Sequence, residues 1–260
     1  MSPVRISLAG AGRMAQAIVV LAADDPGFAV AGVWARDPDA VRDNFLADTT
    51  LVDDLGAVVR GADVLIDFSL PGATALVAAT AAEHRVPLVC GVSGLGAPEL
   101  AALENAAASV AVVYDRNMSQ GVAVLTALVE SAAQSLGADF RVRIDETHHV
   151  AKKDAPSGTA LKLGEAVARA RGQDFASSRW YRPDADPETA PDDAIRFVVE
   201  RRGEVPGDHD VVLASPSERV TLSHSVTTRD VFAEGALRAA RWAAGRSPGL
   251  YGMRDVLGLS

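Results

Sequence analysis

Residues 145–160, with the sequence DETHHVAKKDAPSGTA, concentrate side chains that could do chemistry. Two adjacent histidines, His148 and His149, precede two adjacent lysines, Lys152 and Lys153, and a Pro-Ser-Gly-Thr turn. Imidazole has the unperturbed pKa best suited to proton transfer near neutral pH, and an ammonium group supplies fixed positive charge. The segment therefore predicts an anion-binding pocket with a proton donor beside it.

The turn at residues 156–159 is expected to begin a helix. Pro156 disfavours a helical conformation for the residue before it, and Ser157 belongs to the residue types that cap helix N-termini. Apolar residues then recur at helical spacing as far as Val167. A helix N-terminus presents unpaired N–H groups and a partial positive charge, which favour a carboxylate or a phosphate.

Each part of this segment also has a simpler interpretation. Adjacent histidines can be surface residues or metal ligands, and a lysine pair is often a solvated surface. Because neighbouring side chains on an extended segment point to opposite faces, His148 and His149 would not share one metal ion. We therefore expect no metal. The conjunction of imidazoles, cations and a helix start within one segment favours a binding site.

The N-terminal residues predict a nucleotide site. A β-prone run at residues 4–9 leads directly into a glycine turn and an apolar helical segment. Gly10, Gly12 and Ala15 match the G-x-G-x-x-G/A pattern of dinucleotide-binding units. In that pattern the first glycine makes a tight turn, the second lets a pyrophosphate approach the backbone, and the third position allows close helix packing.

The end of the second expected strand, at residues 28–34, bears on which dinucleotide binds. An acidic residue there would bind the free 2′-hydroxyl of NAD, but the position holds Ala35. Arg36 could pair with a 2′-phosphate or lie over the adenine, and Asp37 could simply cap a helix starting at Pro38. The cofactor is expected to be NADPH or NADH, and the sequence favours NADPH.

Alternating strand-like and helix-like segments up to residue 114 predict an α/β fold of the Rossmann type, a doubly wound parallel sheet. A long helix at residues 119–136 and strand-like segments between residues 140 and 225 predict a second, α+β domain for substrate binding and oligomerisation. A polar stretch at 172–193 is expected to be a surface loop, and residues 250–259 a short tail. The expected domains are residues 1–117 with 230–260, and residues 118–229.

Composition excludes several classes of partner. A net charge of −9 over 260 residues argues against nucleic acid or an anionic membrane surface as the main partner. The single cysteine, Cys90, fits a reducing compartment, and we find no apolar run of membrane-spanning length and no signal peptide. A cytoplasmic location is therefore expected. An anionic ligand would therefore need positively charged groups near its site to offset the net negative charge of the protein.

With these residues in place, the chain resembles the 4-hydroxy-tetrahydrodipicolinate reductase (dihydrodipicolinate reductase) family over nearly its whole length. The most specific match is ETHHVAKKDAPSGTA at residues 146–160. Supporting matches are DFSLP at 67–71, NMSQGV at 117–122, RRGEVPGDH at 201–209, LSHSVTTRDVFAEGA at 222–236 and YGMRDVL at 251–257.

The resemblance implies roles for residues that match the family's motifs. His148 would be the proton donor, Lys152 would hold and polarise the substrate, and His149 would contact the substrate. The turn residues Ser157, Gly158 and Thr159 would bind a carboxylate. The implied cofactor contacts are Gly10, Ala11, Gly12, Arg13, Met14, Arg36, Gly91, Val92, Ser93, Asp115, Arg116, Asn117 and Met118.

The activity implied is NAD(P)H-dependent reduction of 4-hydroxy-tetrahydrodipicolinate or dihydrodipicolinate, small dicarboxylates, to tetrahydrodipicolinate in lysine and diaminopimelate biosynthesis. A homotetramer assembled through the second domain's sheet is also implied. Ala35, Asp115 and Arg116 depart from the family's usual residues. These departures leave two alternatives open, a related NAD(P)-dependent amino-acid or imine dehydrogenase and a catalytically silent NADP-binding regulator.

Overall fold

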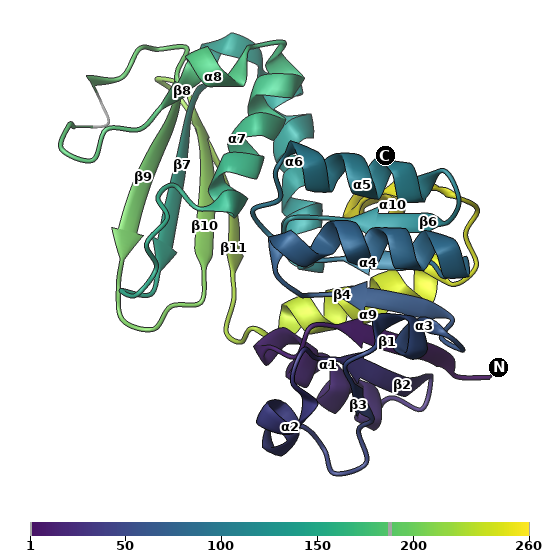
Figure 1. Cartoon of the computed structure of the whole chain (residues 1–260). Coiled ribbons are helices and arrows are strands. Elements are labelled where there is room, and N and C mark those ends of the chain that lie inside the picture. The colour runs from purple at the N-terminus through teal and green to yellow at the C-terminus, as the bar shows by residue number, and fades with distance from the viewer. Residues whose placement is uncertain (1, 187–188, 260) are drawn as a thin grey trace. The chain divides into compact units, whose positions relative to one another are not determined.

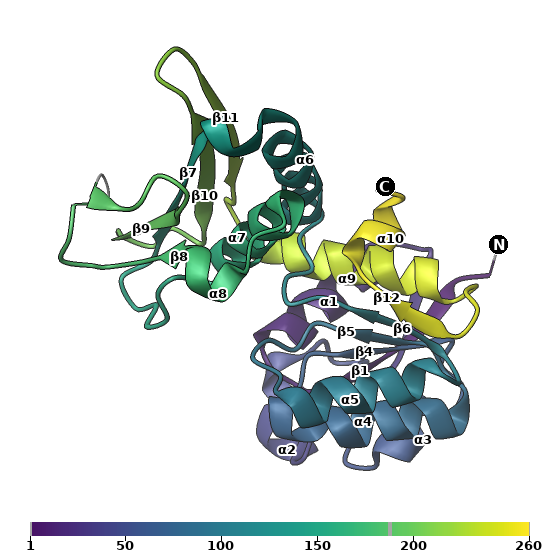
Figure 2. The same cartoon turned by 90° about the horizontal axis from the view of Figure 1, so that it is seen from above.

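The protein folds into two compact units, drawn in Figure 1 and from a second direction in Figure 2. The computed structural model describes residues 2–186 and 189–259. The first unit contains the chain up to Gln120 and again from Asp230 onward, and the second contains Gly121–Arg229. The C-terminal segment therefore returns to the unit in which the chain begins.

The first unit is built on a seven-stranded sheet in the order β12-β6-β5-β4-β1-β2-β3, with every pair of neighbouring strands parallel. Its strands are β1 (Val4–Ala9), β2 (Phe28–Trp34), β3 (Leu51–Val52), β4 (Val64–Asp67), β5 (Leu88–Cys90), β6 (Ala111–Tyr114) and β12 (Gly249–Tyr251). The order 3-2-1-4-5-6 within it is the arrangement of dinucleotide-binding folds, in which ligands lie beyond the carboxyl ends of the strands. The predicted Rossmann-type sheet is confirmed.

Helices cover both faces of this sheet, as Figure 2 shows. One face is covered by α3 (Leu55–Val59), α4 (Pro71–His84) and α5 (Ala97–Ala107), and the other by α1 (Arg13–Asp24) and α9 (Asp230–Ala243). Shorter elements are α2 (Pro38–Val41), the 3₁₀ helix η1 (Arg42–Asn44) and α10 (Met253–Leu257). Fully buried Leu65, Val77 and Leu88 belong to the apolar core between the sheet and the first helical layer.

Two strands of this sheet were not predicted as strands. The segment expected to be only a tail, residues 250–259, begins within β12, which pairs with β6 at Leu250 and Val112. The other, β3, has two residues and pairs with the end of β2. Runs of two or three residues are too short to show an alternating pattern, so only the neighbouring strand defines them as strands.

The second unit is a five-stranded sheet in the order β11-β10-β7-β9-β8. Its elements are α6 (Gln120–Leu136), the 3₁₀ helix η2 (Gly137–Asp139), β7 (Arg141–His148), α7 (Gly158–Arg171), α8 (Phe175–Ser178), β8 (Arg179–Trp180), β9 (Ile195–Arg201), β10 (Asp208–Ala214) and β11 (Arg219–Ser225). Strand β7 pairs antiparallel with β10 and parallel with β9, so the sheet is mixed. The expected second domain of mixed α and β structure is confirmed.

Side chains of α6 and α7 form one core with the inward residues of this sheet. The core includes Val129 of α6, Leu163 of α7 and Ile144 of β7, each fully buried. Residues in β7 alternate between buried and partly exposed along the whole strand. We call residues 145–160 the signature segment. The alternation along β7 decides which of the first side chains of this segment point into the unit.

Helix α6 corrects one expectation from the sequence. Residues 120–139 are helical, long and apolar enough to pass a length-and-composition test for a membrane span, whereas the sequence was expected to contain no such run. The helix buries Val122, Leu125 and Val129 within the protein. A helix that packs one apolar face into a protein core can pass the same test as a membrane span.

The polar stretch at 172–193 is not entirely loop. It contains α8, which begins after the capping carboxylate of Asp174, and the short strand β8, which pairs with β9. Residues 187 and 188 of the expected loop lie outside the described residues. These short elements were not predicted because residues 172–193 are rich in Pro and Asp, which are typical of loops.

Candidate active site

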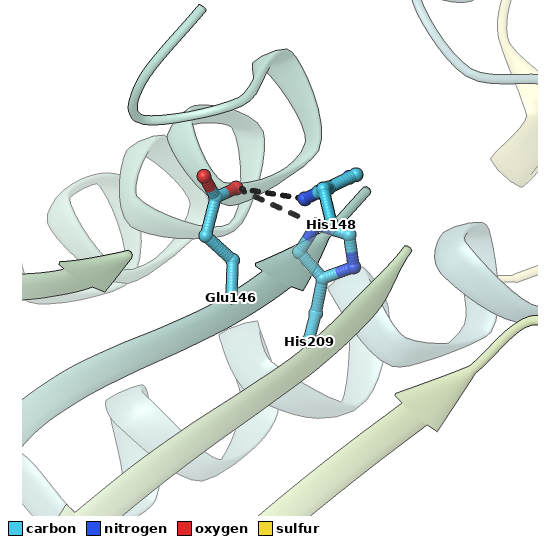
Figure 3. Close-up of side chains that lie close together, drawn as sticks. All are labelled: Glu146, His148 and His209. Carbon is cyan, nitrogen blue, oxygen red and sulfur yellow. Dashed lines mark ion pairs between the residues drawn. The ribbon is translucent and has the colours of Figure 1, made fainter. Parts of the chain in front are cut away.

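Alternation along β7 directs Glu146 and His148 to the buried side of the second unit. Figure 3 shows them beside His209, which comes from the neighbouring strand β10. These three polar side chains are almost inaccessible, with 2% of Glu146, 7% of His148 and 4% of His209 exposed. Polar groups are rarely buried this completely without partners, so their contacts define the local structure.

The Glu146 carboxylate has the most partners of the three. It accepts from the backbone N–H of Ser157, with nitrogen-to-oxygen distances of 3.1 and 3.0 Å to its two oxygens. Oε1 also accepts from Nη2 of Arg201 at 3.3 Å. A buried carboxylate needs such donors to remain ionised, and here they come from the start of α7 and the end of β9.

The two imidazoles lie beside one oxygen of this carboxylate (Figure 3). Oε2 of Glu146 is 3.7 Å from Nδ1 of His148 and 3.9 Å from Nε2 of His209. The rings of the two histidines meet edge to face with centroids 5.1 Å apart. Nε2 of His209 is also 3.3 Å from the Ser157 hydroxyl, so His209 helps to fix the turn that begins α7.

Burial lowers the pKa of both histidines below the usual 6.5. For His148, burial is the largest cause; the Glu146 carboxylate raises its pKa, while the charges of Lys152 and Arg201 lower it. For His209, burial together with the neighbouring His148 lowers the pKa to about 3. His209 is therefore a neutral ring throughout the physiological range, and of these two imidazoles His148 is the one placed to change its charge when an anion binds.

Lys152 lies on the segment between β7 and α7, and its position is fixed from two sides. Its ammonium nitrogen is 2.8 Å from Oδ2 of Asp154. The Arg201 guanidinium donates to the backbone oxygens of Lys152 at 3.3 Å and Asp154 at 2.6 Å. Hydrogen bonding and charge from Lys152 keep the pKa of Asp154 low although burial acts to raise it. A substrate carboxylate would compete with Asp154 for this ammonium group.

The start of α7 has the structure expected for an anion site. Ser157 caps the helix, accepting from the backbone N–H of Ala160 at 3.2 Å, which confirms its predicted role as N-cap. A Cβ added at Gly158 would meet no heavy atom within 4 Å, so the backbone there faces open space. Thr159 follows in the first turn, and His149, half-buried, follows His148. These residues provide N–H and hydroxyl donors for a carboxylate.

Glu146, His148 and His209 also each offer one atom of metal-ligand type, within 4.8 Å of one another. The sequence did not indicate this group, because Glu146 and His209 are distant in sequence and the adjacent pair there is His148 with His149. The Glu146 oxygens already accept from Ser157 and Arg201, and the charges of Lys152 and Arg201 would repel a cation. That no metal binds here therefore stays our prediction.

In the first unit a cavity of about 900 Å³ lies beyond the ends of β1, β2 and β4. Its lining includes Gly10, Gly12 and Arg36. Helix α1 has no side-chain cap and no acidic residue in its first turn, so its N–H groups remain available to an anion. A Cβ at Gly12 would meet no atom within 4 Å, which leaves the backbone open to a pyrophosphate. The residues present thus fit a dinucleotide.

The remaining predicted cofactor residues also follow the carboxyl ends of parallel strands. Ala11 lines the same cavity, and Arg13 and Met14 open α1. Residues 91–93 follow β5 and residues 115–118 follow β6, outside the lining of that cavity. Met118 is 1% exposed and Val92 is 3% exposed, so these two residues offer almost no surface to a ligand in this structure.

Family models match both units separately. The model described as "Dihydrodipicolinate reductase, N-terminus" matches residues 4–118, and the model described as "Dihydrodipicolinate reductase, C-terminus" matches residues 121–257.

The chain belongs to the dihydrodipicolinate reductase family.

Relatives named 4-hydroxy-tetrahydrodipicolinate reductase agree with this assignment. The one from Halorhodospira halophila is 41% identical over 263 residues, covering 98% of each chain. The one from Methylocella silvestris is 42% identical over 269 residues, covering 100% of this chain and 98% of the relative. The family resemblance seen in the sequence motifs is confirmed, and the protein is an oxidoreductase with an NAD(P)-binding unit of the Rossmann type.

A solved structure shares the fold as well. The dipicolinate-bound dihydrodipicolinate reductase from Paenisporosarcina sp. TG-14 has a TM-score of 0.80 and 21% identity, and the match covers 97% of this chain and 99% of that one. At this level of identity the comparison supports the two-unit architecture, not individual site residues.

Three polar residues of this reductase's candidate site had no role assigned from the sequence. Glu146, Arg201 and His209 all lie inside motifs that matched the family. Glu146 could have been found, because it lies two residues before His148 on a strand with alternating burial. Arg201 and His209 come from β9 and β10, and only the strand register brings them to the end of β7.

Gly10 and Gly12 should respond differently to substitution by alanine. Gly10 has φ +96°, and an added Cβ would lie 2.8 Å from Cα of Ser69 and 2.9 Å from the carbonyl oxygen of Phe68. Gly10→Ala should therefore lower the free energy of unfolding by about 1–3 kcal/mol, measured by denaturant titration.

Gly12→Ala should leave unfolding unchanged but weaken NAD(P)H binding about tenfold or more, measured by fluorescence titration. An unchanged cofactor Kd in Gly12→Ala would contradict the placement of the pyrophosphate at this turn.

Proposed function

We propose that the protein is a 4-hydroxy-tetrahydrodipicolinate reductase, reducing that compound or dihydrodipicolinate to tetrahydrodipicolinate in lysine and diaminopimelate biosynthesis. The observation that carries this proposal is the folded signature segment. In it His148, Lys152 and the start of α7 are tied together through Glu146 and Arg201. Membership of the reductase family supports the same reaction.

The substrate's two carboxylates are held by different groups in this proposal. Lys152 leaves its pairing with Asp154 and binds one carboxylate, together with the N–H groups and hydroxyl at Gly158 and Thr159. His149 and nearby donors bind the second carboxylate. Charge-assisted hydrogen bonds of this kind are stronger than neutral ones, which favours a doubly negative ring over a singly charged analogue.

His148 acts as the proton donor. NAD(P)H, when bound at the Gly10–Gly12 turn and beside Arg36, supplies the hydride. Addition of the hydride to the conjugated C=C–C=N system of dihydrodipicolinate leaves an electron-rich enamine, and His148 protonates the carbon next to the reduced position. When the hydroxylated compound is bound, its hydroxyl group leaves as water before the hydride adds. Its pKa is low in the free protein, mainly through burial, and a doubly negative substrate nearby raises it. The imidazole is therefore expected to take up a proton as the substrate binds.

A steady-state assay of NADPH and NADH oxidation with enzymatically generated substrate tests this function. His148→Gln should lower kcat by roughly 10²–10⁴-fold with little change in cofactor affinity, the range typical of a lost general acid. Lys152→Ala should raise KM and lower kcat together. Activity should persist in EDTA. Near-normal kcat in His148→Gln would remove the assignment of the proton donor.

The family relationship leaves little support for the alternatives. A related amino-acid or imine dehydrogenase would oxidise NADPH with oxaloacetate plus ammonia rather than with dihydrodipicolinate, so the two substrates separate these activities. A silent NADP-binding regulator would oxidise no cofactor with either substrate. Both His148 and Lys152, which a silent protein would not need, are present and held in place.

NADPH is the preferred cofactor in this proposal, because of the residues at the end of β2. Arg36 is exposed and lines the cavity, so its guanidinium can reach a 2′-phosphate. Asp37 is already used, since Oδ1 accepts from the N–H of Ala40 and caps α2. Ala35 offers no carboxylate for the 2′-hydroxyl of NAD.

Arg36→Ala should therefore weaken NADPH more than NADH. A loss of one charge-assisted contact corresponds to about tenfold in KM for NADPH, while KM for NADH should change much less. Both values come from the same preparation, so NADH is the internal control. Equal effects on the two cofactors would show that Arg36 does not read the 2′-phosphate.

The second unit's sheet supports a homotetramer, with a second copy of the chain as partner. One face of this sheet packs against α6 and α7. On the other face, positively charged side chains gather toward one end of the strands and negatively charged side chains toward the other end. Toward one end, a cavity of about 340 Å³ is lined by Arg141, Arg143, Arg196 and Arg219. Toward the other end lie Asp145, Glu200, Asp208 and Asp210. Two copies packed antiparallel would place arginines against carboxylates.

Charge reversal at this face should weaken assembly. Arg219→Glu is expected to shift the protein from tetramer to smaller species in sedimentation-velocity runs, more so at low protein concentration. Arg60→Glu, at an exposed position in the first unit, is the matched control and should leave the tetramer intact. A monomeric unmodified protein would contradict the assembly.

We also propose a cytoplasmic location, in keeping with a biosynthetic reductase that consumes NAD(P)H.

A further inference from the structure

We propose that Glu146 is a positioning residue of the reductase, holding His148, the start of α7 and the Lys152 segment in one arrangement through a single buried carboxylate. This inference rests on the proposed function. Glu146 is not expected to touch the substrate, because 2% of it is exposed and its carboxylate is enclosed by protein groups.

The contacts of Glu146 reach every part of the candidate site. Its oxygens accept from Ser157 N–H at 3.1 and 3.0 Å, which fixes the N-terminus of α7. Oε2 lies 3.7 Å from Nδ1 of His148. Oε1 accepts from Arg201 at 3.3 Å, and the same guanidinium holds the backbone oxygen of Lys152. Displacement of this one side chain would release all three groups from each other.

A neutral side chain of the same shape would make some of these contacts. The contacts alone therefore do not explain why residue 146 is a carboxylate. A glutamine could accept from Ser157 N–H through its amide oxygen, and burying an ionised carboxylate costs several kcal/mol before its partners are counted. The advantage of the carboxylate is its effect on the imidazole 3.7 Å away. Negative charge there favours the ring with Nδ1 protonated and turned toward Glu146, which leaves Nε2 facing away from it.

The other groups around His148 show why this charge is needed. Lys152 and Arg201 disfavour the imidazolium form, whereas Asp154 and Glu146 favour it, and His209 is neutral. Asp154 is expected to lose its pairing with Lys152 when substrate binds, so its influence is not constant. Glu146 is the carboxylate whose distance to His148 is set by the strand itself, because both belong to β7.

Glu146→Gln tests the role of the charge with little change in shape. In the folded variant kcat should fall about 10- to 100-fold, with a smaller change in KM, as for removal of a partner that orients an active imidazole. Removing the negative charge should also lower the pKa of His148, because the Glu146 carboxylate acts to raise it. Since the donor must be protonated, the fall of kcat with rising pH should begin at lower pH than in the unmodified protein.

NMR of the ¹⁵N-histidine-labelled full chain reports the pKa of His148 without turnover. The chain has five histidines, and His148→Gln identifies the signal. Glu104→Gln is the matched control, because Glu104 is an exposed residue of α5 in the first unit and belongs to neither proposed site nor to the proposed interface. It should leave both the His148 titration and the pH profile unchanged.

The outcomes separate this inference from the proposed function. Absence of reductase activity in the unmodified protein would overturn the function, while the titration of His148 would still report on Glu146. A Glu146→Gln protein with a normal pH profile, normal kcat and an unchanged His148 titration would overturn the positioning role.

Lower thermal stability alone, with the same pH profile, would mean that Glu146 is a purely structural residue, and this result would also overturn the positioning role. If Glu146→Gln does not fold, Glu146→Asp decides, since it keeps the charge but draws it back by one methylene. It should lower kcat and move the His148 titration toward lower pH.

Discussion

The second unit depends on one buried carboxylate whose partners come from three separate segments. Glu146 accepts from Ser157 at the start of α7 and from Arg201 at the end of β9, and it lies beside His148 on its own strand. A charge this deeply buried is stable only while all of these donors are in place. The arrangement of imidazole, ammonium and helix N-terminus is therefore cooperative, because loss of any one partner leaves the buried carboxylate with fewer groups to compensate its charge.

The expected cofactor site of the first unit depends on backbone groups more than on charged side chains, since Arg36 and Asp37 are the charged residues in the cavity lining. The cofactor's phosphates are expected to meet backbone N–H groups at the start of α1, where Gly12 leaves the space open. Arg36 adds one cation at the cavity edge. In a chain with net charge −9, such local donors are what allow anionic ligands to bind at both units.

Local patterns in the sequence were enough to predict the parallel sheet, the mixed second domain and the N-cap at Ser157. They were insufficient wherever a role depends on neighbours distant in sequence. Strands β3 and β12 are too short to show a period, and Arg201 and His209 reach Glu146 only through strand register. The sequence analysis also did not foresee that residues 120–139 pass a length-and-composition test for a membrane span, and only the structure shows that this helix buries Val122, Leu125 and Val129 within the protein.

The central claim is that the signature segment binds a planar dicarboxylate at Lys152 and the start of α7, with His148 facing the ring. A crystal structure of this chain with pyridine-2,6-dicarboxylate and oxidised cofactor tests it most directly. We expect one carboxylate on the ammonium of Lys152 and on the N–H groups at Gly158 and Thr159, with Lys152 turned away from Asp154. A ligand bound without contact to either Lys152 or the start of α7 would contradict the claim.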